Sequence, residues 1–114
     1  MSVIHLDEAV LGALQEVMEQ EYPLLLDTFL SDSSARLKQL QRAADAEALS
    51  QAAHSLKGSS SNMGAVQLAE LCRQLEQQAH QLSPAETAQL LQAITDEMVV
   101  VQRLYTEERQ RFLS

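Results

Sequence analysis

Apolar residues recur at spacings of three and four residues along almost the whole of this 114-residue chain. That spacing places apolar side chains on one face of an α-helix, whereas a half-buried β-strand requires strict alternation. Three glycines and two prolines are too few for the many turns of a small β-sandwich or barrel, and no apolar run exceeds the four residues Met98–Val101. The sequence therefore predicts an all-α fold without a membrane span.

Capping and turn residues divide the chain into five predicted helices. The boundary residues are Asp7, Pro23, Asp45, Gly64 and a capping box formed by Ser83, Pro84 and Glu86. The short first helix is expected to run to about Glu19, with Val10, Leu14 and Val17 on its packed side. The apolar stripes of the other four span residues 26–44, 49–63, 68–82 and 91–112.

Helices of this length, joined by turns of a few residues, are typical of an antiparallel bundle. We therefore predict one domain over residues 1–114, an up-and-down four-helix bundle with the short first helix as a lid at one end. A chain of this size supports one hydrophobic core, and a second domain is not expected.

The charge balance limits the kinds of partner. Sixteen acidic residues against eight basic ones give a net charge of −8, the wrong sign for a protein that binds nucleic acid through a broad basic face. The N-terminal residues lack the basic and apolar regions of a secretory signal, and a single cysteine cannot form an intramolecular disulfide. We expect a cytoplasmic monomer that binds neither nucleic acid nor membrane.

His54 lies on the predicted third helix, and its helical phase decides its environment. At about 100° per residue, the apolar residues of that helix fall within roughly 60° of Leu49, whereas His54 lies near 140°. A lone histidine among apolar residues is commonly a hydrogen-bonded core residue. Here the phase instead predicts that the ring points toward solvent.

Lys57, Gly58 and Ser61 share the outward face of the same helix. They lie near 80°, 180° and 120° on that scale, so they surround His54 along about two turns. Glycine in a helix interior costs about 1 kcal/mol relative to alanine. Its position one turn after His54 suggests that stability is given up there to leave the imidazole accessible.

The residues from His54 to Gly64 read HSLKGSSSNMG. This stretch resembles the HxLKG(A/S)(A/S)xxxG signature of histidine-containing phosphotransfer (HPt) domains, and the chain length and helix count are similar to those of the stand-alone bacterial type. We see no departure from the signature. The resemblance covers nearly all of the chain, although the first helix and the loops test it weakly.

The resemblance implies that His54 accepts a phosphoryl group from the aspartyl phosphate of a receiver domain in a hybrid sensor kinase. It implies further that His54 passes the group to the receiver aspartate of a response regulator. A neutral imidazole is a good nucleophile near pH 7, and the nearby Lys57 ammonium disfavours protonation of the ring. Lys57 would then pair with the phosphoryl oxygens, and Ser61 could donate one further hydrogen bond.

The sequence contains no Gly-rich phosphate loop and no carboxylate cluster for magnesium. We therefore expect no bound cofactor and no autokinase activity, with Mg²⁺ supplied by the partner receiver domain. The sequence leaves open whether such a phosphocarrier counts as an enzyme.

Two alternatives use the same helices differently. A non-catalytic helical adaptor would explain every apolar stripe by core packing, and only the surface around His54 argues against it. A histidine-kinase dimerisation domain also displays a histidine on a bundle, but its family pattern has an acidic residue directly after the histidine and a proline soon after. Here Ser55 follows His54, and the next proline is Pro84.

Four other residues have side chains that can carry chemistry. Cys72 lies on the apolar face of its helix, which predicts a packed thiol. Glu76 and His80 are four residues apart and could contribute to a metal site, but without a third ligand a solvated contact along the helix is the better interpretation. We expect His5 to belong to a mobile N-terminal segment.

Overall fold

The computed structural model describes residues 3–114, and the helices in it are those that the apolar stripes predict, with small shifts at their ends. The elements are α1 (Glu8–Met18), the 3-10 helix η1 (Glu19–Glu21), α2 (Tyr22–Arg42), α3 (Ala46–Asn62), α4 (Val66–Gln78) and α5 (Pro84–Leu113). Asp7, Asp45 and Ser83 cap α1, α3 and α5 as predicted, and the capping box at Ser83 is complete.

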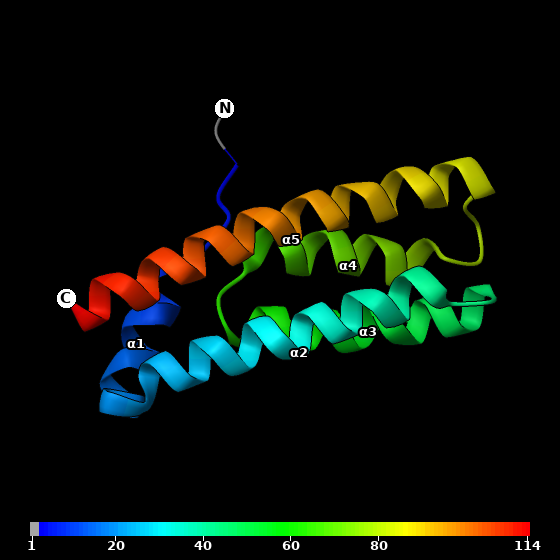
Figure 1. The fold of residues 1–114 in the computed structure, drawn as a ribbon. Coiled ribbons are helices and arrows are strands. Elements are labelled where there is room, and N and C mark those ends of the chain that lie inside the picture. The colour runs from blue at the N-terminus through cyan, green and yellow to red at the C-terminus, as the bar shows by residue number, and fades with distance from the viewer. Residues whose placement is uncertain (1–2) are drawn as a thin grey trace.

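The four long helices form an antiparallel up-and-down bundle (Figure 1). In this bundle α2 packs against α3 and α5, and α4 packs against the same two helices from the other side. Their apolar stripes meet in one core that includes Leu26, Leu56, Leu68 and Val101. The predicted all-α bundle is therefore confirmed.

The short helix α1 lies at the end of the bundle where α3 turns into α4 (Figure 1). The Asp7 amide donates to the Gly64 carbonyl over 2.8 Å, which ties the start of α1 to that turn. Gly64 has a φ of +78°, the left-handed conformation predicted for the residue that ends the third helix. The turn is thus held by its bond to α1 and by the left-handed conformation of Gly64. From it, α3 and α4 run antiparallel along each other as a helical hairpin.

Three boundary predictions need correction. Val17, predicted on the packed side of the first helix, is 79% exposed, and Met18 packs against the core instead. Glu19 has a φ of +51°, which ends α1 at Met18 and starts η1. Met18 is therefore the last residue of α1, and its side chain faces the core. Ala44 and Leu82, predicted in the second and fourth stripes, lie beyond the last residues of α2 and α4.

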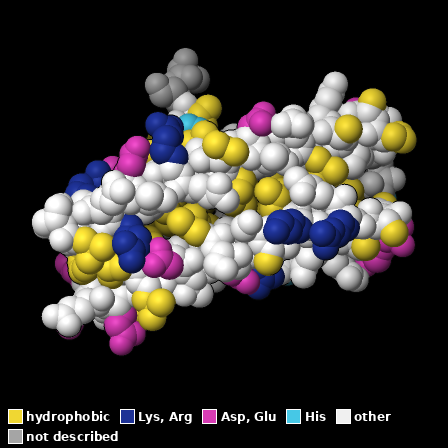
Figure 2. All heavy atoms as spheres, viewed as in Figure 1, with side chains coloured by type: hydrophobic (Ala, Val, Ile, Leu, Met, Phe, Trp, Pro, Cys, Tyr) yellow, Lys and Arg dark blue, Asp and Glu magenta, His cyan; other side chains and the backbone are white. Residues whose placement is uncertain are grey.

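The helices of residues 3–114 all lack an apolar stretch of the length that a membrane span requires. The face seen in Figure 2 carries basic and acidic side chains dispersed among uncharged ones.

Candidate functional site

The imidazole of His54 projects from the middle of α3 and is 69% exposed. Leu49, Ala53 and Leu56, on the opposite side of the same helix, are buried in the core. The helical phase therefore places the ring as predicted, and its surface position is fixed by three buried neighbours on a rigid element.

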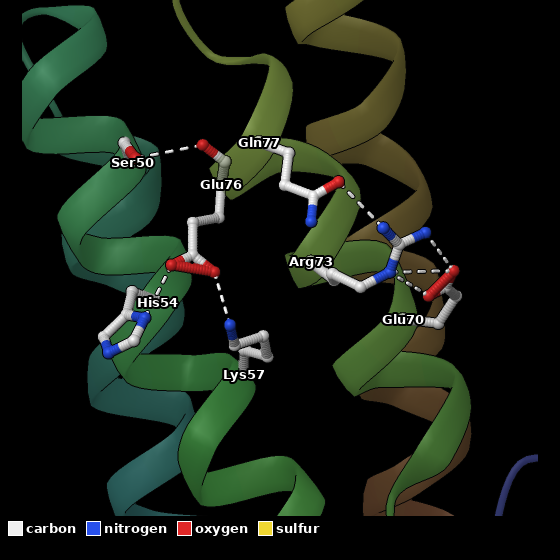
Figure 3. Close-up of polar contacts among 7 residues, drawn as sticks. All are labelled: Ser50, His54, Lys57, Glu70, Arg73, Glu76 and Gln77. Atoms are coloured by element: carbon white, nitrogen blue, oxygen red, sulfur yellow. Dashed lines mark hydrogen bonds and ion pairs between the residues drawn. The ribbon is translucent and has the colours of Figure 1, made fainter.

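Glu76 of α4 reaches across the hairpin to His54. Its Oε2 lies 2.6 Å from His54 Nδ1, and its Oε1 accepts a hydrogen bond of 2.6 Å from Lys57 Nζ (Figure 3). The Glu76 side chain is 21% exposed, and that of Lys57 is 31% exposed. One carboxylate thus joins two of the four predicted site residues.

The surroundings of Glu76 favour its ionised form. The hydrogen bond from Lys57 lowers the pKa of Glu76 below its ordinary value, and the contact with His54 acts in the same direction, whereas partial burial opposes both. The sequence predicts the Lys57 ammonium beside the imidazole. In the structure the ammonium is bonded to Glu76 instead. The carboxylate lies between the ammonium and the ring.

The backbone beneath this contact is also fixed. The Ser50 hydroxyl donates to the Glu76 carbonyl over 3.0 Å, one turn before His54 along α3 (Figure 3). This bond crosses the same α3–α4 seam as the Glu76 carboxylate. It holds the two helices in register at the level of the site.

The second ring nitrogen of His54, Nε2, points away from Glu76 (Figure 3) and has no hydrogen-bond partner among residues 3–114. One turn further on, Gly58 is exposed, and a Cβ added there would meet no atom within 4 Å. Because no side chain stands beside the ring at this position, the approach to Nε2 is open along the C-terminal side of α3.

Ser61 is exposed and lines a shallow groove of about 290 Å³ together with Lys57 and Arg73. It lies seven positions after His54, which corresponds to about 10 Å along the helix axis. The Ser61 hydroxyl therefore does not contact the imidazole. It could reach only a group that extends from the ring toward the C-terminal end of α3.

The role of Glu76 at this site is the feature that the sequence interpretation missed. We predicted a contact between Glu76 and His80 along one helix, but α4 ends at Gln78 and His80 lies in the following turn. Instead, His80 Nε2 lies 3.4 Å from Glu47 Oε2 on α3. The contact between His54 and Glu76 could have been predicted from hairpin geometry. His54 precedes Ala65, in the turn between the two helices, by eleven residues, and Glu76 follows it by eleven.

Two further side chains can be compared with their predictions. His5 is not a free terminal side chain, because its Nδ1 lies 2.7 Å from Oε2 of the buried Glu97. Cys72 is fully buried in the core, as predicted, and burial raises the pKa of its thiol to about 12. Among residues 3–114 no three His, Cys, Asp or Glu side chains lie together as a metal site.

Comparisons with known proteins relate the whole chain to a family and to solved structures. The family model of the Hpt domain matches residues 24–103. The crystal structure of histidine-containing phosphotransfer protein B (HptB) from Pseudomonas aeruginosa is 50% identical in sequence, with a TM-score of 0.89 over 96% of this chain and 98% of that one. A rice protein provisionally described as a histidine-containing phosphotransfer protein shares the fold, with 17% identity and a TM-score of 0.81 over 96% of this chain and 84% of that one. The search of curated proteins found no match.

Proposed function

Because this chain belongs to the Hpt domain family, we propose that it carries a phosphoryl group between two receiver domains of a phosphorelay, with His54 as the acceptor. The donor in this proposal is the aspartyl phosphate of a hybrid sensor kinase. The acceptor is the receiver aspartate of a response regulator. We further propose that the protein works as a monomer in the cytoplasm.

The observation that carries the proposal is an exposed imidazole whose Nδ1 is held by Glu76 while Nε2 is unobstructed. A neutral ring whose Nδ1–H donates a hydrogen bond to the Glu76 carboxylate keeps its lone pair on Nε2. That nitrogen is therefore the proposed nucleophile, and it faces the solvent from which a receiver domain would approach.

The neighbours of His54 supply the other proposed roles. Lys57 stabilises the charge that spreads over the phosphoryl oxygens, since Lys57 follows His54 by one helical turn and its ammonium contacts the same carboxylate as the ring. Gly58 leaves room for the partner's active site. Ser61, in the groove beside Lys57, is the proposed second hydrogen-bond donor to the phosphoryl group.

Phosphoryl transfer with an aspartyl phosphate needs a metal ion to neutralise the aspartate and phosphoryl oxygens. We propose that this Mg²⁺ belongs to the receiver domain, and that the chain itself uses no cofactor and has no autokinase activity. Its contribution is to position one nucleophile and one cation on a rigid surface.

The proposal is tested by incubating the purified chain with a panel of receiver domains labelled on their aspartates. We expect rapid transfer of label from a subset of them, and the label should be lost in acid and survive base, as phosphohistidine does. A chain that binds receivers and takes up no label from any of them would be a helical adaptor, and the proposal would be wrong.

A further inference from the structure

Glu76 contacts both His54 and Lys57, the two groups to which the proposed function assigns the nucleophile and the charge on the phosphoryl oxygens. Before transfer, its two oxygens are divided between the imidazole and the Lys57 ammonium, each at 2.6 Å (Figure 3). No other carboxylate among the described residues lies within hydrogen-bond distance of either group. Any effect of a fixed negative charge on the transfer chemistry is therefore concentrated at this residue.

During transfer, the lone pair of Nε2 forms the N–P bond while the P–O bond to the receiver's aspartate breaks and its electron pair leaves with the carboxylate. The proton on Nδ1 stays where it is, so the phosphorylated ring is an imidazolium with one positive charge. Glu76 Oε2 is already 2.6 Å from that nitrogen. The carboxylate opposes loss of the Nδ1 proton, because an adjacent opposite charge favours the charged form.

The proton matters for the second transfer. When the N–P bond breaks from the protonated ring, the electron pair returns to Nε2 and a neutral imidazole leaves. If Nδ1 has lost its proton, the leaving group is an imidazole anion, which is far less stable, and the phosphoryl group stays on the ring. Retention of the Nδ1 proton therefore decides how readily the phosphoryl group moves on.

On the basis of the proposed function, we infer that Glu76 is a positioning residue that keeps the Nδ1 proton on phosphorylated His54 and so keeps its phosphoryl group transferable at neutral and alkaline pH. Lys57 takes part in the same exchange. Its ammonium leaves Oε1 for the phosphoryl oxygens, and the Glu76 charge then acts on the ring alone.

The other charged groups along the α3–α4 seam have partners of their own. Glu47 and His80 pair on one side of the site, and Arg73 pairs with Glu70 on the other. On α2, which packs against the other side of α3, Arg36 pairs with Asp32 over 2.7 Å. The charges in direct contact with His54 or its partner are thus Glu76 and Lys57.

Glu76→Gln separates charge from position, because the amide oxygen can still accept a hydrogen bond from Nδ1 but carries no charge. Glu70→Gln is the matched control, since Glu70 is a carboxylate of the same helix that pairs with Arg73 and does not contact His54. Phosphorylated wild-type and variant chains are mixed with one acceptor receiver domain over a series of pH values. At each pH the transfer rate of the variant is divided by that of wild type, so that the receiver's own pH dependence cancels.

We expect the pH above which transfer slows to fall by about one pH unit in Glu76→Gln, so that transfer is about tenfold slower at alkaline pH and equal to wild type in acid. The decay of the phosphorylated chain without a receiver should show the same shift. Glu70→Gln should match wild type. An unchanged profile in Glu76→Gln, or a rate lowered equally at every pH, would overturn the inference. Failure of the wild-type chain to take up label would instead disprove the proposed function.

Discussion

Replacement of Gly58 by a longer residue should have opposite effects on stability and on phosphoryl transfer. It is exposed inside α3, and an added side chain meets no atom within 4 Å of its Cβ. Gly58→Gln should therefore raise the free energy of unfolding by up to about 1 kcal/mol, because glycine is a poor helix former. The same side chain lies one turn from His54 and should slow transfer by covering Nε2.

Chemical denaturation and transfer from a labelled receiver measure the two effects on one variant. A Gly58→Gln chain that is more stable and transfers at the wild-type rate would show that the open space is not needed. A less stable chain would show that α3 does not tolerate a side chain at this position.

Lys57 is the cation that shares the Glu76 carboxylate with His54. Lys57→Ala should slow transfer about tenfold to a thousandfold, because the loss of one charge-stabilising donor costs up to about a thousandfold in rate, while the affinity for a receiver changes little. Rapid mixing at saturating receiver separates the two quantities. Transfer at the wild-type rate would mean that Lys57 serves only as a partner for Glu76.

The lowered pKa of Glu76 gives a pH dependence of stability with a definite sign. A carboxyl group whose pKa is lower in the folded chain than in the unfolded one stabilises the fold above the unfolded value, and this contribution is lost as the pH falls through the lowered pKa. The stability difference between wild type and Glu76→Gln should therefore be present at neutral pH and shrink as the pH falls below the ordinary range of a glutamate carboxyl. Urea unfolding at each pH measures it, and a difference that grows on acidification would contradict this cause.

At the level of elements, the turn between α3 and α4 sets the register of the site. Gly64 adopts a φ of +78°, and a Cβ there would lie 3.1 Å from the Asp7 carbonyl oxygen and 3.1 Å from Val10 Cβ. Gly64→Ala should thus destabilise the chain by about 1–3 kcal/mol through backbone strain and displacement of α1.

Gly12→Ala is the control for this prediction, because Gly12 is exposed on α1 with open space around its Cβ position. It should raise stability by up to about 1 kcal/mol. Thermal or urea unfolding of both variants checks the pair. Equal and small effects would mean that the turn tolerates a side chain and does not fix α1.

The sequence predicts helices better than it predicts contacts between them. Periodicity and capping residues locate α3 and the exposure of His54, because both depend on neighbours within a few positions along the chain. The contact between His54 and Glu76 joins residues 22 positions apart and depends on where α3 turns into α4. His5 likewise finds its partner, Glu97, 92 positions away.

At the level of the whole molecule, the bundle acts as a support for one exposed side chain. Buried residues of α3 and the seam with α4 hold His54 in place, while Nε2 remains accessible. Replacement of His54 should therefore leave the core unchanged and remove only the reacting nitrogen. This separation of fold and function makes the central claim open to a single measurement.

That measurement is the uptake of label from a phosphorylated receiver domain by His54→Gln, with His80→Gln as the control at another exposed histidine. We predict that His54→Gln has a free energy of unfolding close to that of wild type and takes up no label, while His80→Gln is labelled like wild type. Label on a folded His54→Gln chain would contradict the account.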